Sequence, residues 1–257
     1  RYTAGTDRPA PAGVKVRVLF PHGDGDAPHY VETETDADGR WVVNNLPAGS
    51  YRVAIPGAMF AEGGPLEGYI AAPNAVTDPN TDQNEGVDHH AIPSDEPNAD
   101  YLGGVVSAGR VELSADTDAD PIAGQEPLGD NVAGLTLAPL TADDFTNLTL
   151  DLALTPPARF TVTKAVDGDA AQWANGPYTI QVSCSYRGAA APGYPRTLTF
   201  PGAGAQTLTA PLGSSCTATE TDSGGATSFT VTPADGLVLS QEQMEAGFVV
   251  TNVFDVG

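Results

Sequence analysis

The sequence predicts an all-β protein made of two tandem β-sandwich domains. Three observations lead to this prediction: Val and Thr recur in short alternating stretches, Gly (29) and Pro (22) are abundant, and no stretch keeps a helical period. The chain has 257 residues, which is too long for one small sandwich and suits two domains. A short stiff linker around Pro156-Pro157 divides the chain into residues 1–156 and 157–257.

The net charge of −22 narrows the classes of partner. Such acidity argues against nucleic acid and against anionic membranes, and it favours solubility and cation binding. No apolar run approaches the length of a membrane span, and we recognise no signal peptide or sorting sequence. We therefore expect an excised piece of an extracellular protein.

Turn signals separate short strands in the first domain, as in a β-meander. Alternating side chains predict strands at 14–20, 30–35, 40–43, 51–55, 105–113 and 146–154, of which the last closes the domain. Lys15 alternates with valines in the first strand and is expected to face solvent. This argues against a covalent cross-link through Lys15.

The run TDADGRWVVNNLPAGSYRVAIP at 35–56 carries a resemblance to a known family. It resembles the B-type repeat of serine–aspartate-repeat surface adhesins and related collagen-adhesin B-type (Cna B-type) domains, over about residues 10–155. The resemblance implies a prealbumin-like or Ig-like β-sandwich in a cell-wall-linked protein that binds calcium. Such repeats usually open with an acidic calcium loop, but residues 1–13 hold only Asp7.

A second acidic segment is the better candidate for calcium. Carboxylate and amide side chains at nearly every second position of one loop can coordinate a hard cation through several oxygen atoms. These residues are Asp78, Asn80, Asp82, Asn84 and Asp88. The alternative is an acidic loop that is merely solvated. The loop is no EF-hand, because Gln83 stands where the turn glycine belongs.

The second domain alternates more regularly than the first. Strands are expected at 159–166, 177–186, 196–200, 206–210, 215–221, 227–232, 236–239 and 247–254. Cys184 and Cys216 both lie on apolar faces of these strands. They are predicted to form an intradomain disulfide in an oxidising compartment, and the alternative is two unpaired core thiols.

Three polar residues share the buried face of their strands. Lys164 has the parity of Phe160 and Val162, Glu220 that of Cys216, and Asn252 that of Val250. An isolated polar or charged group in a core is costly. Two explanations remain: a spontaneous isopeptide bond between Lys164 and Asn252 promoted by Glu220, or a buried Lys–Glu pair beside a hydrogen-bonded Asn.

A second resemblance favours the bond. The stretches FTVTKAV, LGSSCTATETD and FVVTNVF look like an uncharacterised repeat domain of actinobacterial surface proteins, which is itself similar to collagen-adhesin B-type domains. In those relatives the first-strand Lys joins the last-strand Asn beside an acidic residue. The resemblance therefore implies that Lys164 and Asn252 form the cross-link and that Glu220 catalyses it.

Elementary chemistry agrees with these roles. Burial disfavours charge, so it pushes Lys164 towards a neutral, nucleophilic amine and Glu220 towards an acid that can polarise the Asn252 carbonyl. The fold holds the reactants together, which replaces a bimolecular encounter. The reaction has one turnover, so the protein is expected not to be an enzyme.

The function predicted is a structural stalk segment of a Gram-positive cell-surface adhesin or fimbria-like protein, anchored to the cell wall through regions outside this chain. Its partners would be the neighbouring domains of the same protein. The alternative is a calcium-dependent binding module that contacts a host protein, a surface protein or a glycan through the long acidic loops at 56–131. A hydrolase is disfavoured, because the sequence has no G-x-S-x-G motif.

Overall fold

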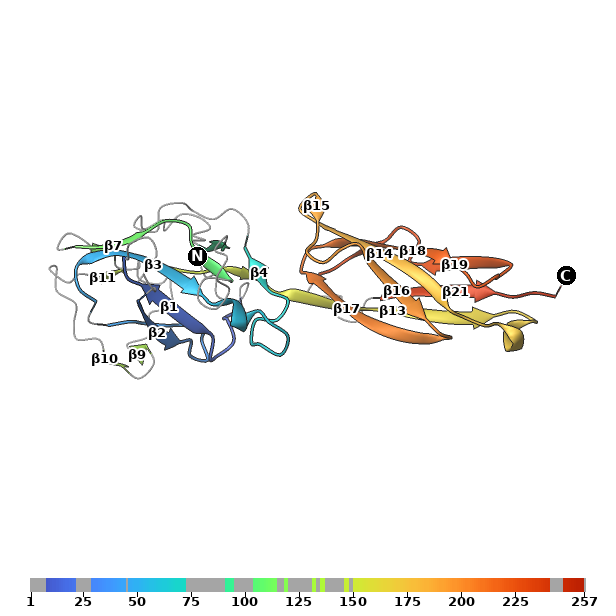
Figure 1. Ribbon diagram of the computed structural model, residues 1–257, viewed down its shortest axis with the longest axis horizontal. Helices are drawn as coiled ribbons and strands as arrows, with labels where there is room; N and C mark the ends of the chain where they lie inside the picture. The colour runs from blue at the N-terminus through green and yellow to red at the C-terminus, as the bar shows by residue number, and fades with distance from the viewer. Residues whose placement is uncertain are drawn as a thin grey trace. The chain divides into compact units, whose positions relative to one another are not determined.

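The chain divides into two compact units, Arg1–Thr155 (unit 1) and Pro156–Gly257 (unit 2), one residue before the expected boundary. Both units are all-β in the computed structural model (Figure 1). The structure describes residues 8–21, 29–44, 46–72, 91–94, 104–114, 118–119, 131–132, 135–136, 146–147, 150–240 and 247–256.

Unit 1 contains one larger antiparallel sheet of strand order β2-β1-β3-β6-β5, with β7 also paired to β3. Its strands are β1 (Lys15–Leu19), β2 (Tyr30–Glu34), β3 (Gly49–Ile55), β5 (Ala91–Pro93), β6 (Val105–Ser107) and β7 (Val111–Leu113). The 3-10 helix η1 (Gly57–Met59) follows β3. The larger core cluster of unit 1, around Val16, Val53 and Leu66, lies on one face of this sheet, and Leu19, Ala54 and Val106 form a smaller buried cluster on the other face.

Three two-stranded sheets complete the described part of unit 1. They pair β4 (Ile70–Ala71) with β12 (Leu154–Thr155), β8 (Asp118–Ala119) with β11 (Thr146–Asn147), and β9 (Asn131–Val132) with β10 (Leu135–Thr136). The closing strand expected at 146–154 is therefore not continuous. Leu150, Leu152 and Leu154 nevertheless pack against the core, as their alternation predicted. The alternation of apolar and polar side chains predicts which side chains are buried. It does not predict whether the backbone pairs with another strand.

The strand expected at 40–43 is also wrong. Residues 41–44 have no strand pairing, although Trp41 and Val43 pack on the core of unit 1. The preceding turn is as expected: the Asp36 carboxylate accepts hydrogen bonds from the backbone N–H groups of Asp38 and Arg40, both at 2.9 Å. Trp41 and Val43 are partly buried by their contact with the core, without any strand pairing of their backbone.

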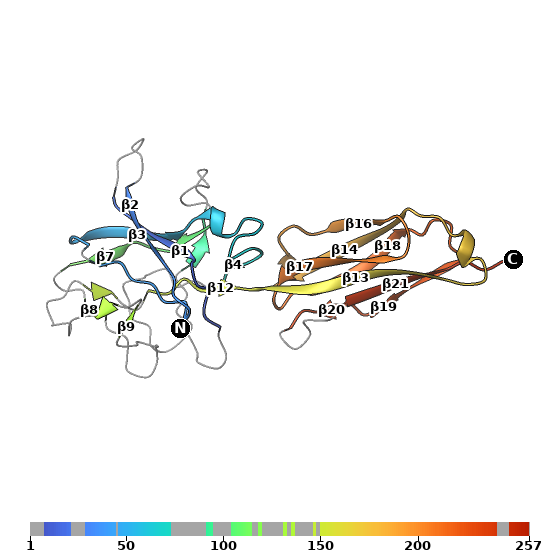
Figure 2. The same ribbon diagram turned by 90° about the horizontal axis from the view of Figure 1, so that it is seen from below.

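Unit 2 is a sandwich of two sheets. One sheet has the order β17-β13-β21-β19, and the other has the order β15-β14-β18-β20 with β16 also paired to β14. The strands are β13 (Pro157–Asp167), β14 (Tyr178–Tyr186), β15 (Ala189–Ala190), β16 (Arg196–Phe200), β17 (Gly204–Pro211), β18 (Ser215–Asp222), β19 (Ser228–Thr232), β20 (Leu237–Val238) and β21 (Gly247–Val253). Figure 2 shows β14, β16 and β18 in one layer and β13, β21 and β19 in the other.

All eight strands expected in the second domain are present, and the short β15 is additional. The 3-10 helix η2 (Ala171–Trp173) lies between β13 and β14. The inward side chains of both sheets form a single core that includes Phe160, Val162, Ile180 and Phe248. Phe160 and Phe248 meet edge to face, with ring centroids 6.3 Å apart. The regular alternation of unit 2 thus corresponds to a two-layer core with polar outer faces.

Candidate functional site

The first and the last strand of unit 2 lie side by side. β13 and β21 are parallel neighbours, with Lys164 opposite Val250 and Val166 opposite Asn252. Paired residues point to the same face of a sheet, so Lys164 and Asn252 both point into the sandwich. A strand spacing of about 4.8 Å and a two-residue rise of about 6.6 Å place their Cα atoms roughly 8 Å apart. An extended lysine side chain can bridge such a diagonal.

Glu220 enters the same cluster from the facing sheet. It lies on β18, and its Oε1 is 2.9 Å from Lys164 Nζ. The β18–β14 register shifts next to this position, because Ile180 faces Glu220 whereas Thr179 faces Asp222. Bulges of this kind redirect side chains and are common next to functional sites. Here the irregularity adjoins the strand position that carries the carboxylate.

The three side chains are buried and incompletely paired. The side chains of Lys164 and Glu220 are 0% exposed, and Asn252 is fully buried. Lys164 Nζ also donates a long hydrogen bond of 3.4 Å to the Val250 carbonyl oxygen. Glu220 Oε1 is ion-paired with Lys164, but among the described residues Glu220 Oε2 and Asn252 Oδ1 have no hydrogen-bond partner. Such unpaired buried groups are costly, so a purely structural role accounts poorly for them.

The amide of Asn252 is held in one orientation. Its Nδ2 donates a 2.9 Å hydrogen bond to the carbonyl oxygen of Ser223, which follows β18 directly. The carboxamide is planar, so Oδ1 points away from this contact. The amide nitrogen is therefore anchored, while the amide oxygen is open to a donor.

Burial lowers the pKa of Lys164 below its ordinary value of 10.5, and the neighbouring Glu220 carboxylate opposes this shift. The ring of Tyr178 adds to the apolar cover, because its centroid lies 4.9 Å from Lys164 Nζ. Burial and the charge of Glu220 both raise the pKa of the Tyr178 hydroxyl, which keeps this group neutral. Lys164 therefore has a greater share of the nucleophilic neutral amine than an exposed lysine.

The other lysine of the chain has the opposite environment. Lys15 Nζ forms a 2.8 Å ion pair with Glu32 Oε1, and the Lys15 side chain is 39% exposed, so it faces solvent as predicted. The hydrogen bond from Lys15 to Glu32 raises the pKa of this lysine. Lys15 is kept charged, whereas Lys164 is driven towards the neutral form.

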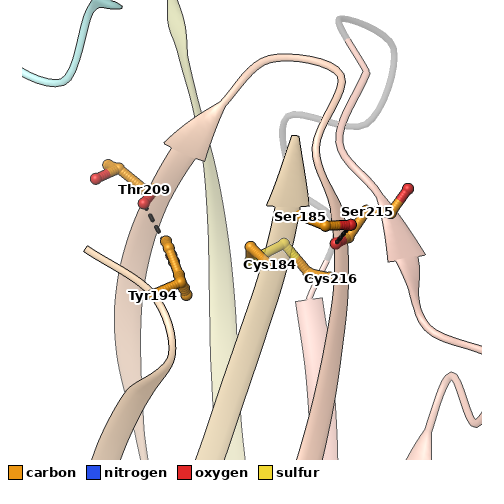
Figure 3. The surroundings of a disulfide bond; sticks show 6 residues. All are labelled: Cys184, Ser185, Tyr194, Thr209, Ser215 and Cys216. Carbon is orange, nitrogen blue, oxygen red and sulfur yellow. Dashed lines mark hydrogen bonds between the residues drawn. A yellow bond between two sulfur atoms is a disulfide. The ribbon is translucent and has the colours of Figure 1, made fainter. Parts of the chain in front are cut away.

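The predicted disulfide is confirmed. Cys184 on β14 and Cys216 on β18 are directly opposite each other, and their sulfur atoms are bonded at 2.04 Å (Figure 3). Beside the disulfide, the Tyr194 hydroxyl donates a 2.8 Å hydrogen bond to the Thr209 carbonyl oxygen. Cys216 and Glu220 share one face of β18, so the disulfide ties the strand that carries Glu220 to its neighbour.

Sequence reasoning missed two members of this cluster. Tyr178 has the apolar parity of Ile180 and Val182, a signal that could have placed it in the core, but its position over Lys164 depends on the packing of two sheets. The Ser223 carbonyl is a backbone group in a turn, and no residue-type pattern reveals it.

The calcium ligands predicted at Asp78, Asn80, Asp82, Asn84 and Asp88 lie outside the described residues. Within the described part of the chain, no group of three or more His, Cys, Asp or Glu side chains is arranged to hold a metal ion. The same residues include no helix with the length and apolar character needed to cross a membrane.

Comparison with solved structures finds several surface proteins. A pilus-presented adhesin is 16% identical over 38% of this chain and 28% of its own, with a TM-score of 0.30, so the match spans less than a third of that protein. The major pilin of Streptococcus pyogenes is 10% identical over 98% of this chain and 94% of its own, with a TM-score of 0.30. A Mobiluncus mulieris adhesin containing intramolecular disulfide, isopeptide and ester bond cross-links is 11% identical over 97% and 87%, with a TM-score of 0.31.

No curated protein matches the chain. The resemblance of residues 10–155 to the serine–aspartate-repeat B-type repeat stays a prediction. Residues 160–255 match a family described as a domain of unknown function (DUF5979). This is the segment for which the sequence predicted an uncharacterised surface-protein repeat domain. It contains Lys164, Glu220, Asn252 and both cysteines, so the candidate site lies wholly within the part of the chain that is similar to this family.

Proposed function

We propose that this chain is a structural stalk segment of a Gram-positive cell-surface adhesin or fimbria-like protein, and that unit 2 is hardened by an isopeptide bond between Lys164 and Asn252. The single observation that carries the proposal is the buried contact of 2.9 Å between Lys164 Nζ and Glu220 Oε1, beside an Asn on the neighbouring strand. The protein acts outside the cell, with the adjoining domains of the same surface protein as its partners.

The reaction needs only groups of this cluster. Moving one proton from Lys164 Nζ to Glu220 converts the ion pair into a neutral amine and a carboxylic acid, with no change in the total charge of the buried site. The amine lone pair attacks Cγ of Asn252, while the Glu220 acid donates a hydrogen bond to Oδ1. This would provide the donor that Oδ1 lacks among the described residues.

The tetrahedral adduct then collapses. Glu220 relays a proton from Nζ to Nδ2, the Cγ–Nδ2 bond breaks, and ammonia leaves. The Nζ–Cγ amide remains, and Glu220 is left with the proton that it took from Lys164 in the first step. One amine and one carboxamide give one secondary amide and one ammonia, so no cofactor or oxidant is needed. The chain reacts once with itself, and the product is a cross-linked protein.

The position of the bond gives it a mechanical role. β13 begins and β21 ends unit 2, and the two strands are parallel, so tension on the two ends of this unit would shear them past each other. A bond from Lys164 to Asn252 would carry that load directly. In the chain-entropy picture, closing a loop of this length also stabilises the unit by about 4–5 kcal/mol.

Peptide mapping tests the site of the bond. Trypsin cleaves after Arg159, Lys164, Arg187 and Arg196. An acylated Lys164 resists cleavage, so a reduced digest should contain residues 160–187 joined to residues 197–257, at the summed mass less one ammonia. Lys164→Arg keeps a long cationic side chain without a nucleophilic amine and should give no joined peptide. Separate peptides from the wild-type protein, with cleavage after Lys164, would refute the proposal.

A further inference from the structure

A tight turn links the candidate site to the end of β18. Ser223, Gly224, Gly225 and Ala226 form a β-turn in which the Ala226 N–H donates to the Ser223 carbonyl oxygen at 3.3 Å. Gly224 and Gly225 have φ values of +62° and +82°, as the two central positions of a type I′ turn require. The Gly224 N–H donates to Asp222 Oδ1 at 3.0 Å, which fixes the entry to the turn.

We propose that this turn is a positioning element of the cross-linking reaction, in which the Ser223 carbonyl holds the leaving nitrogen of Asn252 and Gly224 makes room for Tyr178 over Lys164. The inference rests on the proposed function. It assigns roles to Ser223, Gly224 and Tyr178, none of which reacts.

The Ser223 carbonyl selects the reactive orientation of Asn252. It accepts the 2.9 Å hydrogen bond from Nδ2, the atom that departs as ammonia. A flipped amide would place Oδ1 against this carbonyl, and two acceptors would then face each other. The carbonyl thus leaves Oδ1 free to accept a proton donor, and it can still accept a hydrogen bond from the departing ammonia.

Gly224 is required for the placement of Tyr178. A Cβ atom at position 224 would lie 2.8 Å from Tyr178 Cε1 and 3.1 Å from the carbonyl oxygen of Asn175. Tyr178 is 1% exposed and packs beside Phe254, with ring centroids 6.4 Å apart, so the ring has little freedom to yield. A side chain at 224 would displace either the ring from Lys164 Nζ or the Ser223 carbonyl from Asn252. Both displacements would slow the reaction.

The next residue provides a matched control. Gly225 also has a positive φ, but a Cβ at this position would meet nothing within 4 Å. Gly225→Ala and Gly224→Ala therefore impose a similar backbone strain on one turn, and only Gly224→Ala adds a clash with Tyr178. The difference between the two variants reports the contacts that a Cβ at position 224 makes with the Tyr178 ring and with the Asn175 carbonyl oxygen.

The experiment follows ammonia loss in newly made protein. The full chain is synthesised in a cell-free reaction under oxidising conditions, samples are quenched in acid at intervals, and the reduced intact mass is measured. We expect Gly225→Ala to react within about threefold of wild type and Gly224→Ala to react about 10- to 100-fold more slowly, the range that a misplacement of about 1 Å produces. Tyr178→Leu, which removes the ring without touching the turn, should also be slow.

A double-variant comparison separates positioning from turn strain. If Gly224 acts through Tyr178, then Gly224→Ala should slow Tyr178→Leu by less than about threefold, because the clash has been removed. A full additional effect would show that Gly224→Ala acts through the turn backbone and not through the ring, and would refute the role of Gly224 in placing Tyr178. Each variant is also unfolded in urea in the Glu220→Ala background, to check that equal fractions are folded.

The two proposals fail in different ways. If the wild-type protein never loses ammonia, the proposed function is wrong and this inference falls with it. If the wild-type protein loses one ammonia but Gly224→Ala keeps pace with Gly225→Ala, the cross-link stands and the positioning role is refuted. Rapid reaction of folded Tyr178→Leu would refute the role of the ring in the same way.

Discussion

Lys164 Nζ and Glu220 Oε1 are 2.9 Å apart, although the two residues belong to opposite sheets of unit 2. A buried ion pair is often no more stable than an apolar pair of the same size, so stability alone does not explain this contact. The contact does allow one proton transfer to generate a nucleophile and an acid together. We therefore interpret it as a reactive pair, with Asn252 on the adjacent strand as its target.

The lowered pKa of Lys164 predicts a pH-dependent stability in a variant that cannot react. Asn252→Ala removes the electrophile and leaves the Lys164–Glu220 pair. Between the lowered pKa of Lys164 and 10.5, the unfolded chain binds more protons than the folded one. The free energy of unfolding should therefore rise with pH in this window, and this contribution should be lost as pH falls through the folded pKa.

Urea unfolding between about pH 7.5 and 10 measures this effect. The control adds Lys164→Met and Glu220→Gln to Asn252→Ala, which makes the pair neutral. It retains Tyr51 and Tyr194, whose pKa values burial raises, so their contributions cancel in the difference. Tyr178 is replaced by Phe in both proteins, because the charge of Glu220 also raises the pKa of Tyr178. Equal pH slopes in the two proteins would mean that Lys164 has an ordinary pKa in the folded state.

The parallel pairing of β13 with β21 predicts the response to force. In the cross-linked protein, tension would pass from β13 through Lys164 and Asn252 to the end of β21, and residues 165–251 would carry none. Stretching single molecules should therefore show no unfolding step for unit 2 in wild type. Glu220→Ala should unfold, with the segment between Cys184 and Cys216 still closed.

Reduction of Glu220→Ala should release that segment. The two cysteines are 32 residues apart, so the unfolding step should lengthen by roughly 110 Å. Wild type should be insensitive to the reductant, because its disulfide lies within the bypassed segment. A wild-type protein that unfolds with the same step as Glu220→Ala would show that no covalent bond bypasses the load.

The Cys184–Cys216 disulfide should contribute most where the isopeptide bond is missing. A loop of 32 residues corresponds to about 3–4 kcal/mol of chain entropy. We expect reduction to lower the free energy of unfolding of Glu220→Ala by about this amount. The loss in wild type should be smaller, because its unfolded chain is already constrained. Urea titrations with and without reductant measure both values. If reduction lowers the free energy of unfolding equally in wild type and in Glu220→Ala, the disulfide does not lie within a loop closed by an isopeptide bond.

Calcium binding at Asp78, Asn80, Asp82, Asn84 and Asp88 remains a prediction from the sequence. An acidic extracellular loop of this kind should bind with a Kd of about 0.1–1 mM. Calorimetry on the full chain, with Asp78→Asn/Asp82→Asn as the control, tests it. If calcium titration gives the same heat of binding for both proteins, this loop is not the calcium site. That result would weaken the alternative of calcium-dependent ligand binding.

Much of unit 2 could be predicted from the sequence, because inward apolar and outward polar side chains alternate along its strands. Alternation located every expected strand and placed Lys164, Glu220, Asn252 and both cysteines on buried faces. It could not show that β13 and β21 are neighbours or that Glu220 reaches across from the other sheet. These are long-range pairings, and the period of a strand contains no information about its partner.

In unit 1 the same pattern was less successful. Trp41, Val43 and the leucines at 150–154 are packed against the core as their pattern indicated, but their backbone is mostly outside the described ladders. The Ser223 carbonyl and the turn glycine Gly224 were also beyond prediction. Their contributions depend on backbone geometry and on the space around it, which residue types alone do not specify.

The decisive measurement is the intact mass under reducing conditions, for wild type and for Glu220→Ala. If Lys164 and Asn252 are joined, the wild-type mass is lower than the sequence mass by one ammonia and Glu220→Ala has the full mass. This result would establish the bond and the role of Glu220 together. A wild-type protein with the full sequence mass would contradict the account and leave Lys164 and Glu220 as a buried ion pair.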